Sequence, residues 1–185
     1  MVILKSPGEI EQLRVSNQIV AEVLEKLKGI LQPGMTTGDL DRYAEEMALK
    51  KGARPAFKGY MGYPSSLCVS VNSEVVHGIP SDRVLKDGDI VSLDFGSYYD
   101  GYYGDAAVTL PVGEVSPDAK KLMAVTREAL YRGISEARTN NRLGDISAAV
   151  QQHVEEAGFS VVRDFVGHGI GRNLHEDPQI PNFGL

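Results

Sequence analysis

Several residue types that mark other classes of protein are scarce or missing in this sequence. Cys68 is the single cysteine, so no intrachain disulfide bond can form and a reducing compartment, the cytoplasm, is expected. The net charge is −6 and no basic run is present, which argues against nucleic acid or an anionic membrane as a partner. The sequence also lacks an apolar run long enough for a signal peptide or a membrane span.

The remaining composition is that of a globular protein with a sizeable core. Hydrophobic residues make up 42% of the chain and charged residues 24%, which is ordinary for a folded domain. Capping residues followed by apolar stripes at helical spacing predict helices over residues 6–31, 37–52, 116–137 and 143–158. Strands are expected over residues 67–71, 75–77 and 159–166, and in a hairpin over residues 90–110.

The order of these segments repeats along the chain. Gly38-Asp39-Leu40 is followed by Gly52, and Gly144-Asp145-Ile146 is followed at the same spacing by Gly158. Each pair comes after a helix that starts at Ser-Pro, and units so far apart favour a duplicated half-domain. The sequence therefore predicts an α+β fold with two related lobes that share a site at their seam. The lobes cover about residues 6–112 and 116–185, and the second one lacks its last strands.

The most informative stretch is the predicted hairpin. Asp100-Gly101 between two alternating runs is typical of a type I′ turn. This turn pairs Asp94 with Ala107 and Gly96 with Asp105, so the two carboxylates lie on one face, within about 7–8 Å. The opposite face is apolar and is predicted to face the core, with Val91, Leu93 and Phe95 against Ala106, Val108 and Leu110.

Two carboxylates this close repel each other unless a divalent cation, an arginine or a shared proton lies between them. The alternative is that both are solvated on an exposed face of the sheet. Gly96 favours a bound ligand, since a glycine lets a ligand approach the backbone. His168, between two glycines after an apolar run, has little local packing to explain it. Imidazole with carboxylates suits Zn, Mn, Fe or Co, so Asp94, Asp105 and His168 form an incomplete candidate metal site.

A loop over residues 53–66 interleaves aromatic residues with glycine and proline. Its aromatic side chains are Phe57, Tyr60 and Tyr63. Aromatic residues on such a loop either line a pocket or fasten the loop to the core.

Several motifs together resemble the type I methionine aminopeptidases. They are Gly59–Pro64, Asn72–Pro80, Leu85–Asp94, Asp100–Asp105 and Gly167–Gly171. The resemblance runs in order from Ser6 to Leu185 with matching gaps. Prolidase and creatinase share the fold of this family but not this density of motifs.

The resemblance implies a pita-bread fold and one catalytic domain over residues 1–185. It implies that Asp94 and Asp105 bind two divalent metal ions (Co, Mn, Fe or Zn), with Asp105 bridging them and His168 on the second. His77 and His175 would be the catalytic groups that contact the substrate. The pocket for the methionine side chain would be lined by Phe57, Tyr60, Tyr63, Cys68 and Leu174.

The activity implied by the resemblance is removal of the initiator methionine from nascent proteins. A metal-activated water would attack the first peptide bond, and the enzyme would be a monomer that contacts the ribosome transiently. The family completes its metal site with two glutamates beyond residue 185, so the 185-residue chain alone is expected to bind metal weakly and to hydrolyse little. The alternatives are an inactive or partner-completed peptide-binding homologue, and a metal-free carboxylate-pair hydrolase such as a glycosidase.

Overall fold

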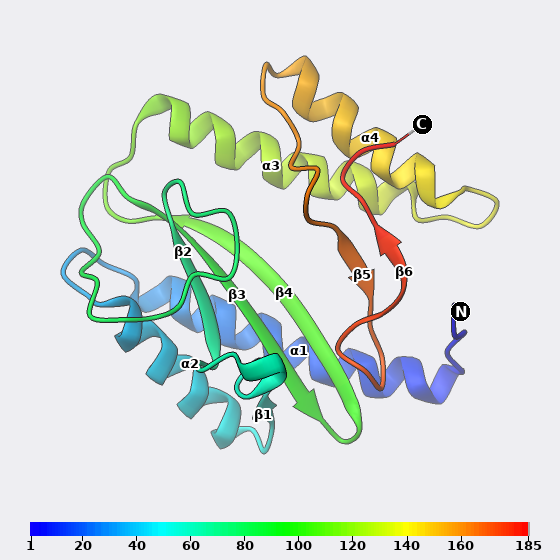
Figure 1. Ribbon diagram of the computed structural model, residues 1–185, viewed down its shortest axis with the longest axis horizontal. Coiled ribbons are helices and arrows are strands. Elements are labelled where there is room, and N and C mark those ends of the chain that lie inside the picture. Colours follow the sequence, from blue (N-terminus) through cyan, green and yellow to red (C-terminus); the bar gives the residue numbers. More distant parts are fainter. Residues whose placement is uncertain (185) are drawn as a thin grey trace. The chain divides into compact units, whose positions relative to one another are not determined.

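The computed structural model describes residues 1–184, which form two compact units (Figure 1). The larger unit comprises Ile3–Ser116 together with Ile170–His175, and the smaller unit comprises Met1–Val2, Pro117–Gly169 and residues 176–184. No helix within residues 1–184 combines the length and the apolar composition that a bilayer span requires.

Both helices of the larger unit begin with capping boxes. Helix α1 (Pro7–Ile30) begins after Ser6, whose hydroxyl accepts a hydrogen bond from the Glu9 amide while the Glu9 carboxylate accepts one from the Ser6 amide. Helix α2 (Thr37–Lys50) begins after Thr36, which exchanges the same pair of bonds with Asp39. These contacts satisfy amide groups that an isolated helix leaves without partners, so both predicted helices are confirmed.

The sheet of the larger unit is antiparallel and is built around strand β3 (Ile90–Tyr99). Strands β1 (Arg54–Pro55) and β2 (Leu67–Val71) pair with one edge of β3, and β4 (Tyr102–Pro111) pairs with the other. A short 3-10 helix, η1 (Tyr60–Gly62), lies between β1 and β2 in the sequence.

The predicted hairpin register is confirmed. Asp94 pairs with Ala107 and Gly96 pairs with Asp105. The turn residues Asp100 and Gly101 have φ values of 46° and 87°, as a type I′ turn requires.

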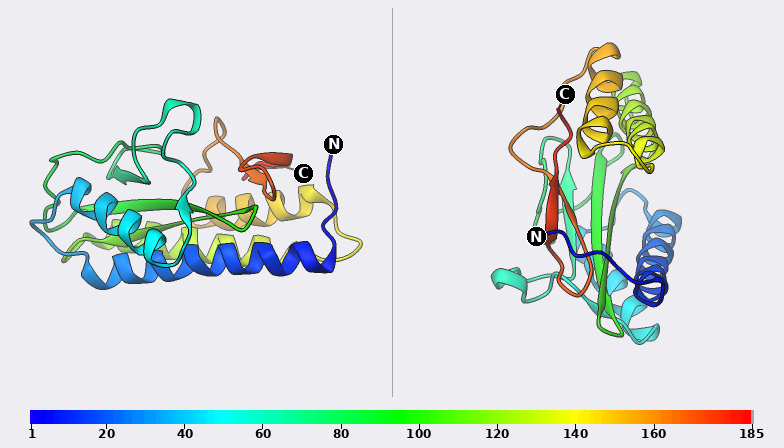
Figure 2. Two further views of the ribbon diagram at one scale, coloured as in Figure 1. Left: turned by 90° about the horizontal axis from the view of Figure 1, so that it is seen from below. Right: turned by 90° about the vertical axis from the view of Figure 1, so that its right-hand side faces the viewer.

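The core of the larger unit lies between this sheet and the helices α1 and α2, which cover one face of it (Figure 2, left). The predicted core face is largely confirmed, because Val91, Leu93, Phe95 and Leu110 are buried. Ala106 is exposed instead, since it lies on β4, an outer strand of this four-stranded sheet.

The predicted strand over residues 75–77 is wrong, because this segment is an exposed loop. Backbone contact with β2 comes just after it, at Gly78. The Val69 amide donates to the Gly78 carbonyl at 2.9 Å, and the Gly78 amide donates to Ser70 Oγ at 3.1 Å. His77, with φ of 59°, turns the backbone away from the extended conformation that a strand needs.

The smaller unit contains two helices and a two-stranded antiparallel sheet. Helices α3 (Pro117–Glu136) and α4 (Leu143–Glu156) pack against each other, and β5 (Gly167–Gly169) pairs with β6 (Glu176–Ile180) through a bulge. Both helices were expected. The predicted strand over residues 159–166 is wrong, because no described segment pairs with those residues and extended pairing begins only at Gly167.

Candidate active site

The two carboxylates of the hairpin meet on one face of the sheet. Asp94 and Asp105 are both partly buried, and their side chains are hydrogen-bonded to each other. Burial raises the pKa of Asp105, and the hydrogen bond with Asp94 opposes that rise. Two carboxyl groups that are partly buried and hydrogen-bonded to each other favour a shared proton or a cation between their oxygens. The alternative of two fully solvated carboxylates does not agree with this geometry.

Helix α1 supports this pair from the side of β4. The Asn17 side chain accepts a hydrogen bond from the Asp105 amide at 3.3 Å and donates one to the Leu13 carbonyl at 2.9 Å. The bond fixes the backbone from which the Asp105 carboxylate projects. Asn17 was missed from the sequence, because a polar residue on an amphipathic helix gives no signal of such a long-range contact.

An apolar cluster lies beside the carboxylates. Cys68 on β2 pairs with Asp94 in the sheet, and its side chain is buried. Cys68 packs with Ala56, Phe57 and Leu174, and the partly buried residues around them are Tyr63, Tyr103 and Ile170. The structure therefore brings together Phe57, Tyr63, Cys68 and Leu174, as the resemblance implied, although their contact with substrate stays a prediction.

Gly96 has a different role from the one expected. A Cβ atom at this position would lie 2.7 Å from Phe57 Cε1 and 2.9 Å from Ala56 Cβ, closer than side-chain carbons pack. The space left by the missing side chain is filled by the Phe57 ring. Gly96 therefore shapes the apolar cluster and does not admit a ligand to the backbone.

The polar groups of the cluster are held uncharged. Tyr63 Oη donates to the carbonyls of Leu67 and Gly78, at 3.1 and 3.0 Å, and burial raises the pKa of its phenol. Burial also raises the pKa of the Cys68 thiol, to about 11. At neutral pH the cluster thus presents an apolar surface with a neutral thiol and a neutral phenol.

We expect Cys68 to resist alkylation in the folded protein. The thiolate is the reactive form, and a buried thiol with a pKa of about 11 supplies very little of it at pH 8. Mass spectrometry after iodoacetamide treatment at pH 8 should show slow labelling of the native protein and rapid labelling in concentrated urea. Equal labelling rates in the two conditions would contradict the buried, neutral thiol.

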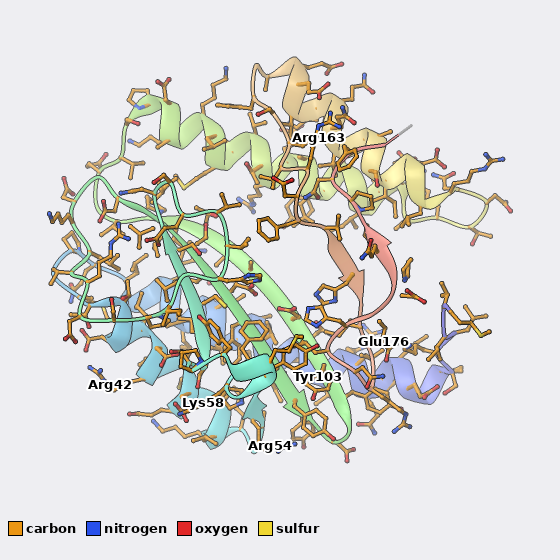
Figure 3. All side chains as sticks on the ribbon, viewed as in Figure 1. Arg42, Arg54, Lys58, Tyr103, Arg163 and Glu176 are labelled. Atoms are coloured by element: carbon orange, nitrogen blue, oxygen red, sulfur yellow. The ribbon has the colours of Figure 1, made fainter. Side chains whose placement is uncertain are left out.

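Tyr60 and His175 are brought together from distant parts of the sequence. Tyr60 Oη lies 2.9 Å from His175 Nδ1, and the two ring centres are 5.3 Å apart. His175 directly follows the buried Leu174, so its backbone is anchored on one side. A shallow pocket of about 180 Å³ continues from Tyr60 and is lined by Arg54, Pro55, Ala56, Lys58, Tyr98 and Tyr103. Arg54, Lys58 and Tyr103 of this lining are labelled in Figure 3.

Two further histidines, His77 and His168, were implicated by the resemblance. His77 is exposed in the loop after β2, next to the Gly78 backbone that bonds to this strand. His168 lies on β5 of the smaller unit, where Nδ1 is 2.9 Å from the Gly169 carbonyl oxygen. Because a carbonyl oxygen only accepts, Nδ1 carries the proton, and Nε2 of the neutral ring is the nitrogen able to bind a metal. Within residues 1–184, no three acidic, histidine or cysteine side chains gather around one point, so this ligand set stays a prediction.

Residues 11–184 match the family model described as metallopeptidase family M24. The chain belongs to that family. It is 54% identical to methionine aminopeptidase 1 of Bacillus subtilis over 184 residues, which cover all of this chain and 74% of the relative. It is 46% identical to the methionine aminopeptidase of Aquifex aeolicus, with 97% and 72% of the two chains covered.

Solved structures agree with this membership of family M24. The crystal structures of methionine aminopeptidase from Rickettsia prowazekii and Thermotoga maritima both match with a TM-score of 0.98, at 38% and 49% identity. Each match covers all of this chain and 75% of the solved one. The expected methionine aminopeptidase resemblance, α+β class and pita-bread fold are confirmed. As an M24 metallopeptidase the chain is a hydrolase that uses divalent metal, which excludes the metal-free glycosidase.

Proposed function

We propose that this chain is a metal-dependent aminopeptidase that removes the initiator methionine from nascent proteins. The observation that carries this proposal is the hydrogen-bonded pair of Asp94 and Asp105 beside the apolar cluster. Hydrolysis of a terminal peptide bond needs a cation that polarises the carbonyl, next to a surface that selects the terminal side chain. Relatives named methionine aminopeptidase at 54% identity support this assignment, and none of them suggests an inactive homologue.

The donor set suits divalent cations. Asp94 and Asp105 supply carboxylate oxygens, and His168 Nε2 supplies a neutral nitrogen, a combination that fits Co, Mn, Fe or Zn. We propose two ions, which Asp94, Asp105 and His168 would help to hold. When bound, such ions polarise the peptide carbonyl and lower the pKa of water. The raised pKa of Asp105 means that a cation also relieves the cost of burying its charge.

The apolar cluster suits the methionine side chain. Its walls are Phe57, Leu174 and Tyr63 with the Cys68 thiol, all uncharged at neutral pH. An unbranched thioether is polarisable and packs well against aromatic rings and sulfur, whereas a charged side chain would lose its hydration there. We therefore propose that these residues select methionine, and that substrates with small second residues are cleaved best.

The polar groups of the site hold the reacting bond. His175, with Nδ1 directed at Tyr60, has a fixed ring orientation and would hydrogen-bond the peptide carbonyl through Nε2. His77 would contact the substrate from the loop after β2. Hydrogen-bond donors that are already in place where negative charge develops in the transition state lower the barrier to hydrolysis. A cytoplasmic location, a monomeric state, transient ribosome contact and one catalytic domain over residues 1–185 remain predictions.

The proposal is tested by metal-dependent release of methionine. The intact mass of the protein purified from its source is measured first. Met-Ala-Ser is then incubated with the protein before and after treatment with EDTA, and after addition of Mn or Co. If the purified protein is heavier than the 185-residue chain, we expect cleavage that EDTA abolishes and metal restores, and no cleavage of Glu-Ala-Ser. A protein of 185 residues should cleave Met-Ala-Ser only weakly.

Two outcomes would contradict this proposal. Cleavage that persists unchanged in EDTA would exclude metal-dependent hydrolysis. Calorimetric binding of Met-Ala-Ser without cleavage, in saturating metal, would indicate a peptide-binding homologue instead.

A further inference from the structure

One carboxylate connects the start of helix α1 to the loop that carries His175. Glu9 Oε2 accepts hydrogen bonds from the Ser6 amide and hydroxyl, both at 3.0 Å. Glu9 Oε1 accepts a hydrogen bond from Tyr102 Oη at 3.0 Å and lies 3.5 Å from Arg172 Nε. The first oxygen therefore caps the helix, and the second makes contacts with residues far away in the sequence.

Arg172 is held by more than this ion pair. Its guanidinium carbon lies 4.6 Å from the centre of the Tyr102 ring, within the range of a cation–π contact. The preceding residue is fixed by the backbone, because the Tyr103 amide donates to the Gly171 carbonyl at 2.8 Å. The Gly171 amide in turn donates to the Asn173 carbonyl at 3.1 Å. The loop is thus fastened to the turn end of the β3–β4 hairpin.

The other end of this loop carries the groups of the candidate site. Leu174 is 2% exposed and packs on Phe57 and Cys68, and His175 lies against Tyr60. Few backbone torsions separate Arg172 from His175, so a change in the position of Arg172 changes the orientation of the imidazole. Hydrogen bonds from the Ser6 amide and hydroxyl hold the pKa of Glu9 at about 2, so its carboxylate is ionised at every pH used for assay.

We propose that Glu9 and Arg172 are positioning residues for the aminopeptidase reaction, which hold the loop 170–175 so that His175 stays directed at Tyr60. This inference rests on the proposed function, in which His175 contacts the peptide. Neither residue touches the substrate. Both act through the backbone of the loop. Tyr102 contacts both of them, since its hydroxyl donates to Glu9 and its ring stacks against the Arg172 guanidinium.

The test separates the two oxygens of Glu9. Arg172→Ala removes the loop contact, Arg172→Lys keeps the charge without the planar stacking group, and Glu9→Gln removes the charge while keeping the shape. Ser6→Ala is the matched control, because it weakens only the capping oxygen and should lower the unfolding temperature without moving the loop. Circular dichroism first establishes that each variant is folded.

Two measurements follow on the folded variants. The first is the ¹⁵N resonance of His175 Nδ1 in histidine-labelled protein, which contains four histidines. The second is kcat and KM for Met-Ala-Ser. We expect Arg172→Ala and Glu9→Gln to shift the resonance and to lower kcat about fivefold with little change in KM, as loss of one charge-assisted contact predicts. Arg172→Lys should restore part of both effects, and Ser6→Ala should leave both at wild-type values.

The outcomes decide the inference separately from the proposed function. An unchanged His175 resonance in both Arg172→Ala and Glu9→Gln would overturn it, and so would an equal change in Ser6→Ala. If the wild-type protein releases no methionine from any substrate, the proposed function fails, and the resonance shift still decides whether these residues position His175.

Discussion

Replacing Asp105 with Asn should stabilise the metal-free protein and strongly weaken its binding of divalent metal. Burial raises the pKa of Asp105 above its value in the unfolded chain, so ionising this carboxyl above that pKa costs folding free energy. The neutral amide avoids this cost, and we expect a gain of about 1–2 kcal/mol at pH 8. At about pH 3 the carboxyl is largely protonated in both states, so the gain should disappear there.

Metal binding should respond in the opposite direction. An amide supplies no anionic oxygen to a cation, so affinity for Mn or Co should fall on the order of 100-fold or more if Asp105 is a ligand. Urea unfolding in EDTA at alkaline and at acidic pH measures the first effect, and calorimetric titration with Mn measures the second. Asp100→Asn is the matched control, because it makes the same change in the turn of the same hairpin, where Asn is equally suitable. Retained metal binding in Asp105→Asn would exclude Asp105 as a ligand.

Replacing Gly104 with Ala should destabilise the larger unit strongly. A Cβ atom there would lie 2.8 Å from the Asn17 backbone nitrogen and 2.9 Å from the Ser16 carbonyl oxygen. These are backbone atoms of helix α1, so the whole helix must move away from β4. The movement would also strain the buried hydrogen bond between the hydroxyls of Ser16 and Ser97, 2.8 Å apart. We expect a loss of about 2–3 kcal/mol in the free energy of unfolding, measured in urea.

A second glycine, in helix α1 itself, provides the control. A Cβ atom at Gly29 would meet no atom within 4 Å, so Ala should fit there without displacement. Because Ala favours helix over Gly, Gly29→Ala should stabilise the protein by about 0.5–1 kcal/mol. Equal and small effects of the two substitutions would mean that α1 does not lie directly on β4.

Local signals explain what the sequence predicted correctly. The register of the hairpin depends on the turn at Asp100-Gly101, whose chemistry permits one tight geometry. The starts of α1 and α2 depend on capping residues within three positions of each other. Because these determinants lie next to the structure they specify, the placement of Asp94 and Asp105 on one face followed from the chain alone.

The wrong predictions concern interactions with partners distant in the sequence. Residues 75–77 and 159–166 contain Val and Phe, which favour strands, but a strand also needs a neighbour with free backbone groups, and propensity does not supply one. A glycine beside two carboxylates favours a ligand near its backbone, but the ring of Phe57 fills the space at Gly96. The contact between Tyr60 and His175, and that between Glu9 and Arg172, had no sequence signal, because no spacing rule connects residues so far apart. The capping box with Ser6 is by itself enough reason for a glutamate at position 9, so Glu9 gave no sign of a second contact.

The hairpin also bears on the order in which the site is assembled during folding. Asp94 and Asp105 are joined by a short local turn, and hairpins of this kind close within about 1–10 μs. The contact between Tyr60 and His175 closes a far longer stretch of chain, and contacts of high sequence separation form late. The carboxylate pair is therefore expected to form before His175 is in place. Under the proposed function, a nascent chain would pass through a state that has its cation-binding carboxylates but not yet the histidine that contacts the peptide.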